Sequence, residues 1–308
     1  LLKAIQADDP GVIREQLIRM ASSFKNFVLL ESHRTSASHR YPGHDRYDFL
    51  AALGSVDQVL GEEYNGFACL KPFAESKNDW LFGYLSYDLK NETERLDSTH
   101  PDGVGFPALH FFQPRYVIIS ENGCVSLDYL PSITSRQQAR DLIQKIFSCE
   151  PSPQADKLLP FLSPRMSRDE YLQTIRQLKQ HIQRGDVYEV TYCQEYYGRG
   201  SIDPCQVYLS LGAYSPAPFS CFYRQEDHYL ICSSPERFLS KSGNKVISQP
   251  IKGTRGRGKT KDEDQLMRKE LQHDVKEQSE NVMIVDLVRN DLSRSAREGS
   301  VSVEELFG

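Results

Sequence analysis

The 308-residue sequence has no long hydrophobic run, no surplus of basic residues and no cysteine motif. No stretch approaches the roughly 20 apolar residues of a transmembrane helix, so we expect no membrane partner. The 37 basic and 42 acidic side chains give a net charge of −5, and a nucleic-acid partner is not expected because phosphate neutralisation requires a basic surface. The seven cysteines lack CxxC or Cys/His metal-ligand spacing, which is typical of free thiols in a reducing compartment. We therefore expect a cytoplasmic protein.

The order of the expected elements predicts an α+β fold with largely antiparallel sheets. Aromatic and β-branched runs bounded by turn residues predict strands, and these runs follow one another in blocks. Prolines concentrated between residues 149 and 164 mark a linker and predict two domains, 1–150 and 151–308. The expected strands cover residues 27–30, 80–87, 108–112 together with 116–119, 187–196, 219–223, 229–233 and 245–251. One expected helix begins at residue 10, and three others span residues 135–147, 167–185 and 260–294.

A candidate phosphate-binding loop lies between Gly253 and Thr260, where the sequence matches G-x-x-x-x-G-K-T. Two features argue against this interpretation. Pro250 interrupts the preceding strand, which in such a site is a central parallel strand with every amide paired. Residues 261–265 are too charged for a helix packed under a parallel sheet. A mobile basic loop is the favoured interpretation, and a P-loop nucleotide-binding module is a distant alternative.

Two glutamates extend an apolar stripe on the helix expected at residues 260–294. Glu277 and Glu280 share one helical face with Ile284, Leu287, Val288 and Asp291. Carboxylates one turn apart suit Mg²⁺, which takes one or two protein carboxylates and keeps positions for water and substrate. The alternatives are two solvated glutamates or a salt bridge to a nearby arginine, and the spacing alone leaves the choice open.

Lys252 follows an expected strand and precedes Gly253 and Thr254. A glycine at this position lets a ligand approach the backbone, and desolvation or neighbouring positive charge makes a lysine amine nucleophilic. Glu236, just after another expected strand, supplies a carboxylate. The alternatives are a surface lysine on an edge strand and a glutamate paired with an arginine in a structural role.

Three motifs follow one another at residues 233–238, 250–254 and 280–292: Ser233-Ser-Pro-Glu-Arg-Phe238, Pro250-Ile-Lys-Gly-Thr254 and Glu280-Asn-Val-Met-Ile-Val-Asp-Leu-Val-Arg-Asn-Asp-Leu292. Together they resemble the chorismate-utilising enzymes, which include anthranilate synthase component I and para-aminobenzoate synthase component I. The match is closest to the aminodeoxychorismate-forming members. The resemblance implies a β-sandwich-like core with flanking helices. It also implies truncation at the C-terminus, because the family continues past the equivalent of Gly308.

The resemblance implies a reaction for Lys252, at a position where anthranilate synthases usually have alanine. The amine would attack ring carbon 2 of chorismate and expel the C4 hydroxyl. Ammonia would then add at C4, giving 4-amino-4-deoxychorismate for para-aminobenzoate and folate synthesis. Glu236 would be a catalytic carboxylate. The other implied site residues are substrate-lining positions and Mg²⁺ ligands: Gly253 and Thr254 for chorismate, Glu280 and Glu277 for the metal.

The resemblance also implies a protein partner and an effector pocket. A separate glutamine amidotransferase subunit would supply ammonia and contact the N-terminal domain. Some members hold tryptophan in that domain, and Ser32, Pro216 and Phe219 would contact it here. Glu189 stands where water-activating members have lysine, which argues against water as the nucleophile. Anthranilate formation is the close alternative, and a non-catalytic effector-binding module is the alternative of a different class.

Overall fold

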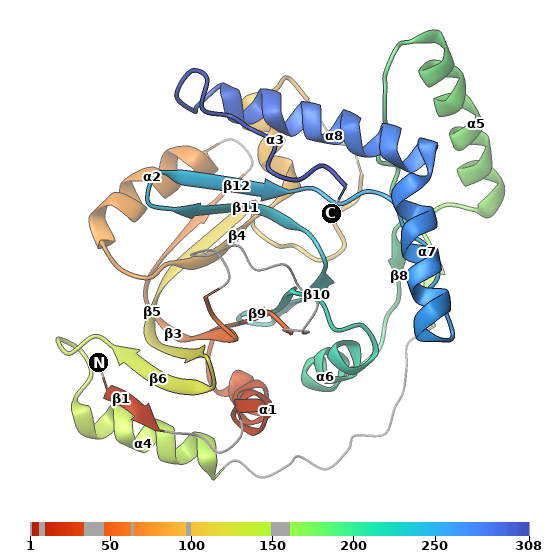
Figure 1. The fold of residues 1–308 in the computed structure, drawn as a ribbon. Helices are drawn as coiled ribbons and strands as arrows, with labels where there is room; N and C mark the ends of the chain where they lie inside the picture. Colours follow the sequence, from red (N-terminus) through yellow and green to blue (C-terminus); the bar gives the residue numbers. More distant parts are fainter. Residues whose placement is uncertain are drawn as a thin grey trace. The chain divides into compact units, whose positions relative to one another are not determined.

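An eight-stranded sheet forms the centre of one of the two compact units of the chain (Figure 1). The computed structural model describes residues 2–5, 10–33, 46–62, 65–96, 100–148 and 161–307. The first unit comprises Leu1–Pro151 and Tyr208–Gly308, and the second comprises Ser152–Val207. The sheet joins strands from both sides of residue 150, and the two-domain division at that residue stays a prediction.

The strand order in this sheet is β1-β6-β5-β3-β2-β9-β10, with β4 paired to β5. All pairings among the described strands are antiparallel, which confirms the predicted α+β class with antiparallel sheets. The long strand β3 was not predicted. The bounds are β1 (Leu2–Ile5), β2 (Asn26–Glu31), β3 (Phe49–Gly61), β4 (Phe82–Leu85), β5 (Leu109–Glu121), β6 (Cys124–Tyr129), β9 (Phe219–Gln225) and β10 (His228–Ser234).

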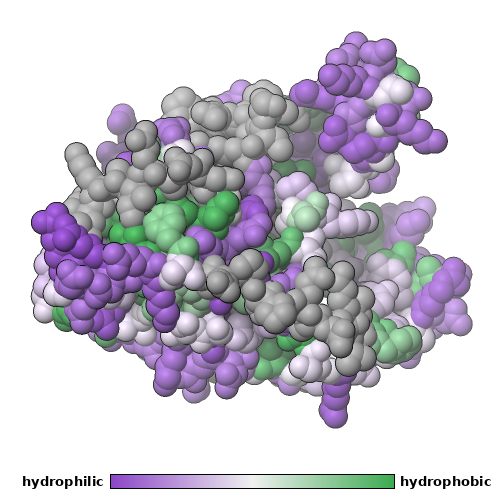
Figure 2. Space-filling view, turned by 90° about the horizontal axis from the view of Figure 1, so that it is seen from below, coloured by the Kyte–Doolittle hydropathy of each residue, from purple (hydrophilic) through white to green (hydrophobic). Residues whose placement is uncertain are grey.

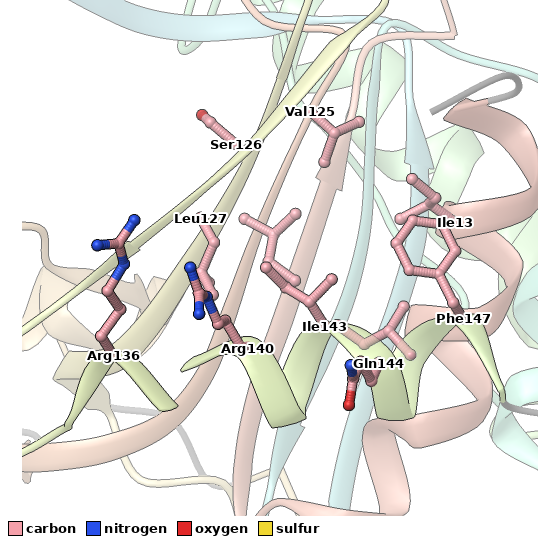
Figure 3. Close-up of a pocket in the computed structure, with 11 residues that line it drawn as sticks. Ile13, Val125, Ser126, Leu127, Arg136, Arg140, Ile143, Gln144 and Phe147 are labelled. Atoms are coloured by element: carbon pink, nitrogen blue, oxygen red, sulfur yellow. The ribbon is translucent and has the colours of Figure 1, made fainter. Parts of the chain in front are cut away.

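Helices α1 (Pro10–Met20) and α4 (Arg136–Phe147) pack against each other and supply apolar side chains to the core. In α4 the buried residues Ala139, Leu142 and Ile146 recur three and four positions apart, so one face of the helix is apolar. A cavity of about 370 Å³ lies between α4 and the strands β5 and β6. Figure 3 shows apolar side chains along it and the guanidinium groups of Arg136 and Arg140 at one end.

The predicted helix at residues 260–294 is two helices, α7 (Lys261–His273) and α8 (Val275–Ser293). They are separate because Asp274 leaves the helical conformation, and its side chain accepts hydrogen bonds from the amides of Lys276 and Glu277. Before them, β11 (Arg237–Ser242) and β12 (Lys245–Gln249) form an antiparallel hairpin. The remaining helices of this unit are α2 (Gly66–Lys77), α3 (Lys90–Thr93) and the 3₁₀ turns Ala21–Ser23 and Tyr87–Leu89.

The second unit contains α5 (Arg168–Arg184) and the short strands β7 (Ser163–Pro164) and β8 (Tyr196–Tyr197). The predicted helix at 167–185 is confirmed, with a Ser167 capping box and Gly185 as its left-handed cap. The predicted strand at 187–196 is wrong: in the described chain only its last residue pairs with another strand. Helix α6 (Pro204–Tyr214) spans the division between the units, and most of the expected linker, residues 149–160, lies outside the described residues.

Many large apolar side chains are exposed in the described chain, among them Phe161 at 88 % and Phe238 at 82 %. On the face seen in Figure 2, hydrophobic side chains lie in patches between polar and charged ones. None of the described helices combines the length and apolar character needed to cross a membrane.

A buried histidine on β5 forms hydrogen bonds to side chains of two other strands of the sheet. His110 on β5 is fully buried, with Nδ1 2.6 Å from the Tyr223 hydroxyl and Nε2 3.3 Å from Gln58 Oε1. Because the amide oxygen can only accept, the neutral ring donates through Nε2 and accepts through Nδ1. Burial lowers the pKa of His110 to about 4, so the folded protein keeps this imidazole neutral.

Because the folded protein keeps His110 neutral, we expect the protein to lose stability in acid. The unfolded side chain titrates near 6.5 and binds a proton below that pH, whereas the folded one titrates near 4 and does not. From about pH 7 to about pH 4.5, we expect this group to lower the free energy of unfolding by about 2–3 kcal/mol. Urea denaturation at both pH values measures this change in the free energy of unfolding. His110→Gln should remove this part of the pH dependence, and the exposed-site control His273→Gln should keep it. Equal pH dependence in both variants would contradict the prediction.

Candidate active site

A cavity of about 1740 Å³ lies beside the β11–β12 hairpin, within the first unit. Its wall combines the end of β2, the starts of β3 and β9, the hairpin, one side of α8 and the segment after it. Figure 1 shows α8 running along the hairpin. Three of the predicted site residues line this cavity, namely Lys252, Ser32 and Phe219.

Lys252 lies in the cavity wall, and β12 ends three residues before it. Gln249 is the last paired residue, and Pro250 lacks the amide that would extend the ladder. The next amide, that of Ile251, donates to Glu236 Oε1 at 3.1 Å. This hydrogen bond ties the β10–β11 connection to the end of β12, and it places the Glu236 carboxylate against the backbone of the residue before Lys252.

Gly253 is positioned against helix α8. Its φ is +82°, and a Cβ at this position would lie 2.8 Å from Glu277 Oε2. The left-handed backbone therefore favours glycine, whereas the end of the flexible Glu277 side chain could move away from a Cβ. The structure thus brings Gly253 and Glu277 together, whereas Thr254 is exposed in the loop that follows.

Glu277 and Glu280 lie one turn apart near the start of α8, with side chains 22 % and 33 % exposed. Lys276 Nζ lies 3.1 Å from a Glu280 oxygen and 3.4 Å from a Glu277 oxygen. Hydrogen bonds to Glu280 and Glu277 raise the pKa of Lys276. A single cation therefore reaches both carboxylates, and this oxygen donor set fits Mg²⁺. No group of three or more His, Cys, Asp or Glu side chains suited to a metal occurs among the described residues.

The side of α8 that faces the cavity differs from the predicted stripe. The apolar stripe was expected from the spacing to face the core, but Leu287 is 55 % exposed and Asp291 is also exposed, so that expectation is wrong. The prediction assumed that the packed side of the helix is its most apolar one. In the structure, the side of α8 that lines the cavity includes the polar residues Asn281 and Arg289. The lining residues of α8 are Asn281, Val285, Val288, Arg289 and Leu292.

The predicted tryptophan-pocket residues are only partly brought together. Ser32 Oγ donates to the Asp48 carbonyl at 3.0 Å, and the Arg237 guanidinium lies 4.9 Å from the centre of the Phe219 ring. Pro216 is exposed and does not line the cavity. Pro218, in the same loop, lines it together with Phe219. Binding of tryptophan by these residues stays a prediction.

Two buried charged residues of the cavity wall were not singled out from the sequence. Arg237 is buried and donates to Gln249 Oε1 at 2.7 Å, which fixes the base of the hairpin. Glu31 is buried at the end of β2, where it accepts from the Tyr208 hydroxyl and from Arg14. The sequence carried a signal for each residue. Arg237 lies inside the motif at residues 233–238, and Glu31 directly follows the apolar run at residues 27–30.

The candidate phosphate-binding loop does not have the required surroundings. The preceding strand β12 pairs antiparallel with β11 and is not part of a parallel sheet. The loop amides are occupied by acidic side chains: Gly258 donates to Asp264, and Lys259 and Thr260 donate to Glu263. Carboxylates at these amides would repel a phosphate, so the P-loop alternative is wrong.

Comparison with known proteins identifies relatives over most of this chain. The chain is 30 % identical over 321 residues to aminodeoxychorismate synthase component 1 of Bacillus subtilis (strain 168), covering 95 % of this chain and 68 % of that protein. It is 31 % identical over 235 residues to anthranilate synthase component 1 of Thermus thermophilus, covering 73 % and 50 %. The crystal structure of anthranilate synthase component I from Streptococcus pneumoniae TIGR4 matches with a TM-score of 0.65 at 21 % identity, covering 86 % and 65 %.

The chain thus spans between half and about two thirds of the length of these proteins. At 21 % identity, the likeness to the solved structure concerns the fold alone. The model of the family described as chorismate binding enzyme matches residues 29–308, which include the hairpin, Lys252 and helix α8. The chain therefore belongs to the chorismate binding enzyme family.

Proposed function

We propose that the protein converts chorismate and ammonia to 4-amino-4-deoxychorismate, the precursor of para-aminobenzoate and folate, with Lys252 as nucleophile. The observation that supports this most is the place of Lys252, in the wall of the large cavity next to the segment bound by Glu236. The similarity to aminodeoxychorismate synthase component 1 of Bacillus subtilis over 95 % of this chain supports the same reaction.

In the proposed reaction Lys252 Nζ forms a bond to ring carbon 2 while the C4–oxygen bond breaks and the hydroxyl leaves as water. The departing hydroxyl takes its proton from Glu236. Ammonia then bonds to C4, the carbon–Nζ bond breaks with its electron pair returning to the Lys252 amine, and the C4 ammonium gives one proton back to the Glu236 carboxylate. Glu236 is the candidate to carry a proton, because the hydrogen bond from the Ile251 amide holds its carboxylate beside the segment that carries Lys252. Gly253 and Thr254 would line the substrate, with the glycine leaving the backbone accessible.

We propose that Glu280 and Glu277 hold Mg²⁺ at the first turns of α8. Their carboxylates already share one cation, the Lys276 ammonium, and Mg²⁺ takes one or two protein carboxylates with water and substrate oxygens completing its shell. When bound, the ion would neutralise a carboxylate of the dianionic substrate. We further propose a cytoplasmic location and a separate glutamine amidotransferase as the source of ammonia.

The reaction is tested by product analysis after incubating the purified protein with chorismate, ammonium and Mg²⁺. We expect 4-amino-4-deoxychorismate, identified by mass spectrometry, without release of pyruvate. Fluorescent anthranilate with an equal amount of pyruvate would overturn the proposal in favour of the anthranilate-forming alternative. Absence of any chorismate consumption by the whole protein, including any sequence that follows Gly308, with either ammonium or a glutamine amidotransferase would overturn both.

Loss of one candidate metal ligand provides a separate prediction. We expect Glu280→Gln to raise the Mg²⁺ concentration for half-maximal activity by about tenfold or more, because a carboxylate is replaced by a neutral amide. The measurement is initial rate against Mg²⁺ concentration at saturating chorismate. Glu75→Gln, at an exposed position on α2, is the matched control and should leave the Mg²⁺ dependence unchanged. An identical curve for Glu280→Gln would contradict its assignment as a ligand.

A further inference from the structure

Two cysteines face each other across the β9–β10 hairpin. Cys221 and Cys232 are directly paired in the antiparallel register. Opposed residues in such a pair have Cα atoms about 4.5–5.5 Å apart, with side chains on the same face of the sheet. This separation falls within the range of about 4.4–6.8 Å that a disulfide spans. The backbone therefore already holds the two residues at a bonding distance.

The two thiols also contact each other. A hydrogen bond between them raises the pKa of the Cys221 thiol well above its usual value and lowers the pKa of Cys232 to about 7. Burial contributes to the effect on Cys221, which packs against the core of the sheet. The pair is thus asymmetric, with Cys221 keeping its proton as donor and Cys232 as the nucleophile.

The other described cysteines are not arranged in this way. They lie singly on different elements, α2, β6, the segment before β8, and α6: Cys69, Cys124, Cys193 and Cys205. Cys124 is exposed and serves as an internal reference for an accessible single thiol. Among the described cysteines, therefore, Cys221 and Cys232 are the two that lie directly opposite each other on neighbouring strands.

We propose that Cys221 and Cys232 are a reversible disulfide-forming site that reacts with low-molecular-weight disulfides such as oxidised glutathione. The Cys232 thiolate attacks one sulfur of oxidised glutathione, forming a mixed disulfide and releasing one glutathione thiolate. Cys221 then loses its proton and attacks the Cys232 sulfur, releasing the second glutathione. Two protein thiols are oxidised and one glutathione disulfide is reduced to two thiols, and excess reduced glutathione reverses both steps.

The bond would fasten the edge strand β10 to the interior of the sheet. Cys221 is also paired with Leu30 on β2, and Cys232 Sγ lies 3.9 Å from the carbonyl oxygen of Phe219, which lines the large cavity. Strand β10 continues directly into the connection that carries Glu236. The proposed site therefore lies at the base of the candidate active site, and it does not depend on which reaction that site performs.

Peptide mapping of the whole protein tests the proposal. The reduced protein is treated with oxidised glutathione, the remaining thiols are blocked with N-ethylmaleimide, and the digest is analysed by mass spectrometry. We expect the 221 and 232 peptides to be joined by a disulfide, with both residues losing N-ethylmaleimide labelling. Treatment with dithiothreitol before labelling should restore both labels.

Two variants separate the chemical steps. Cys221→Ser should stop the reaction at the first step and retain one glutathione on Cys232. Cys232→Ser should leave Cys221 labelled by N-ethylmaleimide, and the control Cys124→Ser should form the 221–232 disulfide as the native protein does. The native protein itself decides the case without any variant. Recovery of both residues as labelled thiols, or of two separate glutathione adducts, while Cys124 reacts fully would overturn the proposal.

Discussion

Replacement of Lys252 by alanine is expected to lower kcat for amination of chorismate by about 1000-fold or more, because the variant lacks the proposed nucleophile. The surrounding geometry should persist, since the bond from the Ile251 amide to Glu236 involves the backbone and not the lysine side chain. Glycine at position 253 keeps its contact with Glu277 for the same reason. Steady-state kinetics with saturating ammonium and Mg²⁺ measure the change.

Two further variants separate nucleophilic attack from simple charge. Lys252→Arg keeps a cation in the cavity wall but provides no amine that loses its proton, so its kcat should fall about as far as that of the alanine variant. Lys71→Ala, at an exposed position on α2, should retain native kinetics. An unchanged kcat for Lys252→Ala, with a rise in KM alone, would show that the lysine only binds substrate.

The parts of the fold that were predicted well are those with local signals. The helix at 167–185 has its own start and stop: Ser167 and Glu170 form a capping box and Gly185 adopts the left-handed conformation. Strand β3 carries no such signal, because its residues change from buried to exposed halfway along its length. Its existence depends on pairing with β2, the strand directly before it, and with β5, which lies far from it in the sequence.

The predicted site residues were located by motif, and their geometry was not accessible from spacing. The bond between Glu236 and the Ile251 amide depends on how the β11–β12 hairpin closes, with a register shift between Arg237 and Ser240. The contact of Gly253 with Glu277 depends on where α8 begins, which Asp274 determines by breaking the predicted long helix. Neither feature follows from helical or strand periodicity.

Replacement of Glu31 by alanine is expected to lower the free energy of unfolding by about 3–5 kcal/mol. The carboxylate side chain is 5 % exposed, lies 3.3 Å from Arg14 Nη1 and accepts from the Tyr208 hydroxyl. Burial and the Glu31 charge raise the pKa of Tyr208, so the phenol stays a donor to this carboxylate. Removing the carboxylate leaves a partly buried guanidinium and a buried hydroxyl without their acceptor, which is the costly way to break such a pair.

The comparison that isolates burial is with Glu75→Ala, which removes an exposed glutamate 4.0 Å from Lys71 on α2 and should cost no more than about 0.5 kcal/mol. Urea denaturation at neutral pH measures both variants. A loss for Glu31→Ala as small as that for Glu75→Ala would contradict the prediction. The source of the effect is tested by a double-mutant cycle with Tyr208→Phe. If the hydroxyl and carboxylate stabilise the fold through each other, the cost of Glu31→Ala falls in the Tyr208→Phe background, whereas independent contributions would simply add.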